Sequence, residues 1–286
     1  MRITNKYGLP QAFVKMAESD YEYRPKRYSV TSILKGVRET ILERRHHNEI
    51  EVDVSDMVWA LFGTAVHEIL ASQQEKPHEL KEEYLKIPVG DYSLTGRLDL
   101  YNEHTKTITD YKTCSTWKVI YGDYADWRKQ LLVYAYMLQE IGFEVTNGEI
   151  IAFLKDHSKS QAKRKADYPD LPVRKITFRF GPEDYAWADE WIHERFRLIA
   201  ECELLPDDEL PLCSDEERWY SGDTYAVMKK GRKTALRVLD TLGDAEAWAD
   251  DKECYIEYRP GEDRKCMDYC RAAPFCNYYL EKYAMH

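Results

Sequence analysis

The stretch GRLDLYNEHTKTITDYKT, residues 96–113, contains two runs of alternating apolar and polar residues joined by a polar segment. This pattern predicts two antiparallel strands connected by a four-residue turn at 103–106. Side chains two apart on a strand share a face, so we expect Asp110 and Lys112 to point the same way. In the register that this turn sets, Asp99 lies directly opposite Asp110 on that face.

Two carboxylates and an ammonium group therefore converge on one face of the predicted hairpin. Like charges that face each other across a ladder repel, so the arrangement favours a divalent cation between Asp99 and Asp110. Carboxylates are hard oxygen ligands, which suit Mg²⁺ or Mn²⁺. The alternative interpretation is that both aspartates are ordinary strand-end residues and that Lys112 is a solvated charge.

The rest of the chain predicts an α/β fold in which helices pack around a small sheet. Ser29 or Thr31 is a suitable N-cap for the first helix and Ser55 for the second. The spacing of apolar residues predicts helices over 29–45, 54–73, 127–141 and 182–204, and strands over 82–101, 107–112, 149–155 and 176–180. A long polar and basic connection follows at 155–174.

Two further short motifs flank the hairpin. GTAVH, upstream, contains His67 on a predicted helix, where a single histidine is more often a core residue. QLLVY, downstream, contains Gln130 and Tyr134 one helical turn apart, a pair that in isolation is more often a surface and a core residue.

Taken together, GTAVH, GRLD, DYK and QLLVY in this order resemble the RecB-like branch of the PD-(D/E)XK nuclease superfamily. That branch includes the CRISPR-associated RecB-like exonucleases and many phage recombination nucleases. The resemblance spans roughly residues 30–155 and implies a restriction-endonuclease-like core, a small mixed sheet flanked by helices. The chain departs from the family pattern in having Asp110 where Glu is more frequent and no proline before Asp99, and both departures are common in the superfamily.

The resemblance also implies roles for individual side chains. His67, Asp99 and Asp110 would bind the metal, and Lys112 would orient or activate the attacking water. The motif residues of the downstream helix, which would line the DNA path near the scissile phosphate, are Gln130 and Tyr134.

These residues predict a metal-dependent DNA nuclease, most simply an exonuclease that acts in recombination, repair or phage DNA processing. Divalent cations lower the pKa of bound water and stabilise charge on the leaving 3′ oxygen. An inactive nuclease-fold iron–sulfur subunit that binds DNA is one alternative, and the intact Asp99, Asp110 and Lys112 count against it. A zinc-stabilised endonuclease is another, which the RecB-like His67 and the QLLVY motif disfavour.

The seven cysteines predict a second metal site. Cys266, Cys270 and Cys276 lie within eleven residues, with three and five residues between them. Four thiolates can hold Zn²⁺ or a [4Fe–4S] cluster, and structural zinc usually brings a C-x₂-C pair, which this chain lacks. The trio is similar to that of iron–sulfur nucleases in the RecB-like group, which implies [4Fe–4S], with zinc as the alternative.

The fourth ligand of such relatives commonly lies upstream of the nuclease core, where this chain has no cysteine. We expect Cys213 to take that place because it alone lies in a proline-flanked loop, LPLCSDEERW. The remaining cysteines, which lie in or beside predicted helices and strands, are Cys114, Cys202 and Cys254. The sequence thus predicts a nuclease core with N-terminal helices over 1–204 and a metal-clamped region over 205–286.

Composition limits the partners of the protein. The net charge of −10 over 286 residues argues against nucleic-acid binding through bulk charge. The N-terminus lacks the features of a signal peptide, and we expect no membrane-spanning run and a cytoplasmic location. The expected partner is DNA, as single strands or duplex ends. Recombination or replication proteins are further candidate partners, and the oligomeric state stays open. Phosphate contacts are expected from two basic runs, Lys155, Lys159, Lys163, Arg164 and Lys165, and Lys229, Lys230, Arg232 and Lys233.

Overall fold

The computed structural model describes residues 1–18, 23–74, 76–250 and 253–284. These residues divide into two units by their contacts, and each unit is described by itself. The first contains residues 1–35 and 47–204, and the second contains residues 36–46 and 205–286, of which 251–252 and 285–286 lie outside the described residues. The predicted division grouped residues 36–46 with the N-terminal helices. Their contacts instead assign them to the same unit as the cysteine-rich region.

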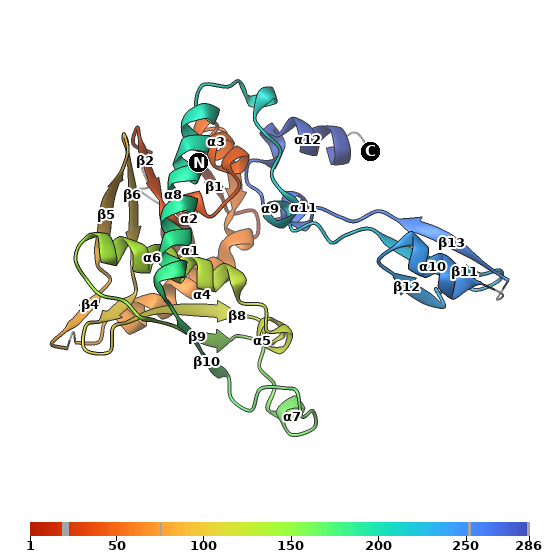
Figure 1. The fold of residues 1–286 in the computed structure, drawn as a ribbon, viewed down its shortest axis with the longest axis horizontal. Helices are drawn as coiled ribbons and strands as arrows, with labels where there is room; N and C mark the ends of the chain where they lie inside the picture. The colour runs from red at the N-terminus through yellow and green to blue at the C-terminus, as the bar shows by residue number, and fades with distance from the viewer. Residues whose placement is uncertain (19–22, 75, 251–252, 285–286) are drawn as a thin grey trace. The chain divides into compact units, whose positions relative to one another are not determined.

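The first unit is built on a five-stranded mixed sheet in the order β10-β9-β8-β7-β4, so the predicted α/β class is confirmed. β8 and β9 are parallel, and the other neighbours are antiparallel, with β8, β9 and β10 side by side in Figure 1. The strands are β4 (Glu79–Lys81), β7 (Leu100–Asn102), β8 (Thr107–Cys114), β9 (Asn147–Leu154) and β10 (Val173–Arg179).

The β7–β8 hairpin has the predicted register. Leu100 pairs with Thr109 and Asn102 with Thr107, which leaves a four-residue turn at 103–106. Asp99 directly precedes the paired residues of β7, and Asp110 directly follows Thr109 on β8. The turn length and the two-residue period of a strand together decide this placement.

Two long helices contact alternate side chains of β8. α4 (Val54–Ala71) lies beside Thr113, whose hydroxyl oxygen would be 3.2 Å from a Cβ added at Gly63. α6 (Ala125–Glu140) contacts the face that carries Asp110 and Lys112, through Gln130. α8 (Pro182–Cys202) packs on α6. The predicted helices at 54–73, 127–141 and 182–204 are therefore confirmed.

The N-terminal part of the unit differs from the prediction in two places. The predicted helix over 29–45 is divided into α2 (Val30–Ile33) and α3 (Val37–Arg45), with a break at Gly36 that belongs to the second unit. Ser29 caps α2 by accepting a hydrogen bond from the Ser32 backbone N–H at 3.2 Å, as predicted.

The predicted cap of the 54–73 helix was wrong. α4 begins after Asp53, whose carboxylate accepts hydrogen bonds from the backbone N–H groups of Ser55 and Lys6. An ionised aspartate at this position satisfies helix N–H groups and favours the helix dipole, so it takes the capping position from the serine two residues later.

The smaller elements of the first unit complete it. A three-stranded sheet in the order β2-β6-β5 packs against α2 and α6, and β1 pairs with β3 in parallel. Gly90 and Asp91 form the turn between β5 and β6, with Gly90 at a φ of +55°. The elements not yet bounded are β1 (Arg2–Thr4), α1 (Gln11–Ala17), β2 (Arg27–Ser29), β3 (Glu51–Asp53), β5 (Tyr84–Val89), β6 (Tyr92–Arg97), α5 (Thr116–Tyr121) and α7 (Lys159–Ala162).

α4 is unusually apolar. Its eighteen residues have a mean hydropathy of 1.2, so among the described residues this helix is long and apolar enough to cross a membrane by length and composition. The helix passes this test because it carries only two acidic side chains, Asp56 and Glu68, and no lysine or arginine. The helix packs against α1 and β8 in the first unit.

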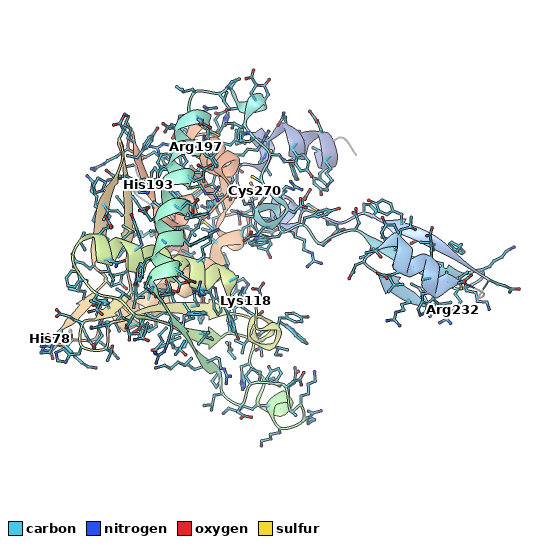
Figure 2. The ribbon with its side chains drawn as sticks, in the orientation of Figure 1. His78, Lys118, His193, Arg197, Arg232 and Cys270 are labelled. Carbon is cyan, nitrogen blue, oxygen red and sulfur yellow. The ribbon has the colours of Figure 1, made fainter. Side chains whose placement is uncertain are left out.

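The second unit combines a small sheet with short helices. α10 packs on a sheet in the order β12-β11-β13 (Figure 1). Arg232, in the basic run predicted to contact phosphate, lies in the turn between β11 and β12 (Figure 2). Besides α3, the elements are η1 (Asp207–Glu209), α9 (Asp215–Arg218), β11 (Thr224–Lys229), β12 (Arg237–Leu239), α10 (Leu242–Ala249), β13 (Cys254–Arg259), α11 (Arg264–Asp268), η2 (Ala273–Phe275), α12 (Asn277–Tyr279) and η3 (Leu280–Ala284).

Asp263 joins the C-terminal elements of this unit. Its side chain is fully buried and accepts hydrogen bonds from Arg218 Nε at 2.8 Å, Tyr278 Oη at 2.7 Å, and Lys282 Nζ and Tyr283 Oη at 2.9 Å. Burial alone would raise the pKa of this carboxyl, but the four donors hold the pKa well below its usual value.

We expect Asp263→Ala to destabilise the second unit by about 3–5 kcal/mol, because it leaves the buried Arg218 guanidinium without this partner. The pKa of the Asp263 carboxyl is lower in the folded protein than its value of about 3.9 in the unfolded chain. Such a carboxyl stabilises the fold at any pH above about 3.9, and this stabilisation is lost as the pH falls toward the pKa of the folded state. Urea unfolding between pH 7 and pH 3 measures both effects. The exposed Asp268→Ala is the matched control, and equal stability of the two variants at pH 7 would contradict the assignment.

Candidate active site

Asp110 and Lys112 lie together on one face of β8. Lys112 Nζ is 2.7 Å from Asp110 Oδ2, and the backbone alternation of the strand explains why these two side chains meet. Gln130 on α6 bridges them, since its Oε1 accepts a hydrogen bond from Lys112 Nζ at 2.9 Å and its Nε2 donates to Asp110 Oδ1 at 3.2 Å. Three of the predicted site residues therefore form one hydrogen-bonded group.

Asp99 contacts both the hairpin and α4. Its Oδ2 accepts a hydrogen bond from the Tyr111 backbone N–H at 2.7 Å, and its Oδ1 lies 3.4 Å from His67 Nδ1. The Tyr111 ring meets the His67 ring edge to face at 6.2 Å between centroids. The histidine of GTAVH thus reaches the aspartate of GRLD, as the motif order predicts.

A third carboxylate, Glu82, joins this pair. The ligand atoms of His67, Glu82 and Asp99 all lie within 4.8 Å of one another, a group that could hold a metal ion. Glu82 lies between β4 and β5 at a φ of +51°, and its backbone N–H donates to the Asp99 carbonyl oxygen at 3.1 Å. Sequence reasoning missed Glu82 because its approach depends on how β4 and β7 pair, which no local motif marks.

The electrostatics of the site indicate crowded negative charge. Burial raises the pKa of Asp110, Lys112 opposes that rise, and the charge of Asp99 adds to it. Burial and then Asp99 raise the pKa of Glu82, whereas a hydrogen bond with Asp99 raises the pKa of His67. Carboxylates whose pKa values rise through burial, with a further contribution from a neighbouring carboxylate, favour a bound cation.

The donor set fits a divalent ion. The carboxylates of Asp99 and Glu82 supply hard oxygens and His67 supplies an imidazole nitrogen, a set typical of Mn²⁺ and compatible with Mg²⁺. The buried Oδ2 of Asp110 is ion-paired with Lys112 but makes no hydrogen bond of acceptable geometry within the described residues. Asp110 itself lies outside the group of three.

Tyr134, by contrast, is buried against β6 rather than exposed on an open surface. Only 6 % of it is exposed, and burial raises the pKa of its hydroxyl. A Cβ added at Gly96 would lie 2.6 Å from Tyr134 Cε1, which explains physically why GRLD begins with glycine. Tyr134 therefore supports the strand that leads into Asp99.

The four predicted cluster ligands line one pocket of the second unit. Cys266, Cys270 and Cys276 come from α11 and the segment after it, and Cys213 comes from the loop before α9. Figure 2 labels Cys270 in this region. The other cysteines, which do not line the pocket, are Cys114, Cys202 and Cys254.

The pocket suits a metal ion or metal cluster that is held by thiolates. Burial raises the pKa of Cys213 and Cys270 to about 12 and that of Cys266 to about 11, so these thiols stay protonated at neutral pH unless a metal displaces the proton. Arg38 Nε donates to Cys276 Sγ at 3.2 Å. A Cβ at Gly36 would lie 2.6 Å from Cys213 Sγ, so the helix break at Gly36 makes room for this sulfur.

Comparison with known proteins agrees with this geometry. The family model of the PD-(D/E)XK nuclease superfamily matches residues 17–277. The chain belongs to the PD-(D/E)XK nuclease superfamily. Nucleases of this superfamily use divalent metal ions, so the His67, Glu82 and Asp99 group of this PD-(D/E)XK chain is the candidate metal site. No curated protein matches it in sequence.

Three solved structures resemble this PD-(D/E)XK protein at low identity. The structure of SSO0001 has 16 % identity and a TM-score of 0.45, and covers 66 % of this chain and 82 % of its own. A phage related exonuclease from Haemophilus somnus 129PT has 12 % identity and a TM-score of 0.28, with coverages of 66 % and 79 %. A putative exonuclease from Eubacterium rectale has 12 % identity and a TM-score of 0.31, with coverages of 65 % and 72 %.

Proposed function

We propose that this PD-(D/E)XK protein is an Mg²⁺- or Mn²⁺-dependent DNA exonuclease that acts in recombination, repair or phage DNA processing. The observation that carries the proposal is the convergence of Asp99, Asp110 and Lys112 on one hairpin, with His67 and Glu82 beside Asp99. The exonuclease part rests on the RecB-like order of the four motifs.

Each side chain has a distinct task in this proposal. His67, Glu82 and Asp99 would hold the divalent ion, which when bound supplies Lewis-acid activation of water and of the phosphoryl oxygens. Asp110 would join them on the adjacent strand through its buried Oδ2.

Lys112 would orient the attacking water and balance negative charge at the phosphate. Its ammonium is fixed by Asp110 at 2.7 Å and by Gln130 at 2.9 Å, so it needs little rearrangement to act. Gln130 would position Lys112, and Tyr134 would hold the GRLD strand through its contact with Gly96.

We further propose that Cys213, Cys266, Cys270 and Cys276 bind a [4Fe–4S] cluster that stabilises the second unit. One tetrahedral zinc requires sulfurs about 3.8 Å apart, given Zn–S bonds of about 2.3 Å. Among the described residues, no three of these sulfurs lie within 4.8 Å of one another, which favours the larger cluster over a single zinc. Arg38, which donates to Cys276 Sγ, would stabilise the charge of the bound thiolate.

Incubation of anaerobically purified protein with end-labelled DNA tests the function. We expect cleavage of linear DNA in Mg²⁺ or Mn²⁺, no cleavage in EDTA, and survival of closed circular DNA. Cleavage of circles would identify an endonuclease instead. The absence of cleavage in either metal, with DNA binding retained, would favour the inactive DNA-binding subunit.

A further inference from the structure

The part of α4 before His67 carries two exposed aromatic side chains. Trp59 is 60 % exposed and Phe62 is 46 % exposed, and their rings meet edge to face at 6.4 Å between centroids. Neither residue takes part in the metal group or in the bonds among Asp110, Lys112 and Gln130. Two large aromatic rings exposed side by side on a helix that carries a site residue indicate a binding surface.

Trp59 is connected to the active site along α4. Gly63, one turn later, lies beside Thr113, the residue that follows Lys112 on β8. His67 is eight residues beyond Trp59, which is about 12 Å along a helix. That length equals about three to four stacked nucleotides at 3.4 Å each.

A lysine from a different element contacts the Trp59 ring. Lys155 follows the last residue of β9, and its backbone N–H donates to the Cys114 carbonyl oxygen at the end of β8 at 3.0 Å. The Lys155 ammonium lies 4.2 Å from the centroid of the Trp59 ring. α4 and the paired strands β8 and β9 therefore bring the Trp59 ring and the Lys155 ammonium together beyond the end of β8.

We propose that Trp59 and Lys155 bind an unpaired DNA strand next to the catalytic hairpin, with a base stacked on the indole and a phosphate on the ammonium. Lys155 covers one face of the ring, and the exposed remainder is open to a base. Proteins that hold single strands combine aromatic stacking with cations that follow the backbone. This subsite deepens the proposed function and rests on it.

Charge supports nucleic acid as the occupant of this face. The chain carries a net charge of −10, yet Lys155 opens the basic run that continues through the exposed α7 and the residues after it. A neutral apolar partner or a lipid tail would gain nothing from an ammonium held over the ring, whereas a phosphate gains an ion pair.

Binding of fluorescein-labelled single-stranded DNA, measured by anisotropy on the full chain without divalent metal, tests the subsite. We expect Trp59→Ala to weaken binding about tenfold, the loss of one stacked base, and Trp59→Phe to restore most of it. Lys155→Ala should reduce the slope of log affinity against log salt by about 0.7, the loss of one phosphate contact.

Trp187→Ala is the matched control, since Trp187 is a half-exposed tryptophan on α8 that also has a lysine near its ring. It should bind as the wild type does. If wild-type protein cleaves linear DNA in Mg²⁺ but Trp59→Ala binds single strands unchanged, the subsite is wrong and the nuclease function stands. That outcome would leave the aromatic face to a lipid or protein partner. If the wild type neither cleaves nor binds DNA, both proposals fall.

Discussion

Lys112→Ala is expected to lower metal-dependent DNA cleavage by at least about 100-fold, the loss that follows removal of a positioned group that stabilises transition-state charge. Lys112 Nζ is held 2.7 Å from Asp110 and 2.9 Å from Gln130, so no neighbouring ammonium in that bonded group can replace it. The measurement is the initial rate of nucleotide release from linear duplex DNA at saturating Mg²⁺ and Mn²⁺.

The control for this variant lies on the same hairpin. Lys106, in the turn, is ion-paired with Glu144 and exposed, so Lys106→Ala should retain wild-type cleavage. Removal of Lys112 leaves the buried Asp110 carboxylate without its cation, which could cost stability. Lys112→Gln keeps a hydrogen-bond donor at this position, so it serves as a second variant in case Lys112→Ala does not fold. Cleavage near the wild-type rate by either folded Lys112 variant would overturn the catalytic assignment.

Cys213→Ser is expected to remove most of the iron from protein purified without oxygen, which otherwise should be brown and contain about four irons per chain. Cys213 joins the loop before α9 to the three cysteines that follow residue 263, so its loss should loosen the whole second unit. Iron analysis and limited proteolysis, with digestion of 205–286 before the nuclease core, measure both effects.

Cys202→Ser and Cys254→Ser are the controls, because neither cysteine lines the pocket. Both variants should keep their iron. Colourless wild-type protein with one zinc per chain would show that the pocket is a zinc site. Bleaching by Cys254→Ser, with Cys213→Ser unchanged, would show that the fourth ligand is misassigned.

The parts of the site that local sequence decides were predictable. The four-residue turn sets the register of Leu100 against Thr109, and the two-residue period of a strand brings Asp110 and Lys112 to the same face. Gln130 reaches Lys112 from a different element, and its assignment came from the resemblance of QLLVY to the family motif. The placements within the hairpin depend on residues close together in the chain.

The parts that depend on distant contacts were not predictable. Glu82 reaches Asp99 only because β4 pairs with β7, and no motif surrounds it. The predicted 29–45 helix is interrupted before Gly36, a residue that lies against Cys213, far away in the sequence. The cap of α4 shifted to Asp53 because Lys6 and Ser55 both donate to that carboxylate.

The role of Cys213 remains a prediction of a different kind. It was chosen because it alone of the four remaining cysteines lies in a proline-flanked loop, and in the structure it lines the same pocket as the C-terminal trio. Sequence alone could not weigh it against Cys254, because both lie in the second unit and the pocket forms only when α3, α9 and α11 come together.

The most direct test of the central claim is nucleotide release from linear duplex DNA over a range of Mn²⁺ concentrations, by the wild type and by Asp99→Asn. Asp99 belongs to the metal group with His67 and Glu82 and also bonds the catalytic strand, so this change removes a ligand charge with little change of shape. We predict metal-dependent release by the wild type and none by folded Asp99→Asn at any Mn²⁺ concentration. Equal release by both proteins would contradict a phosphodiesterase site at this hairpin.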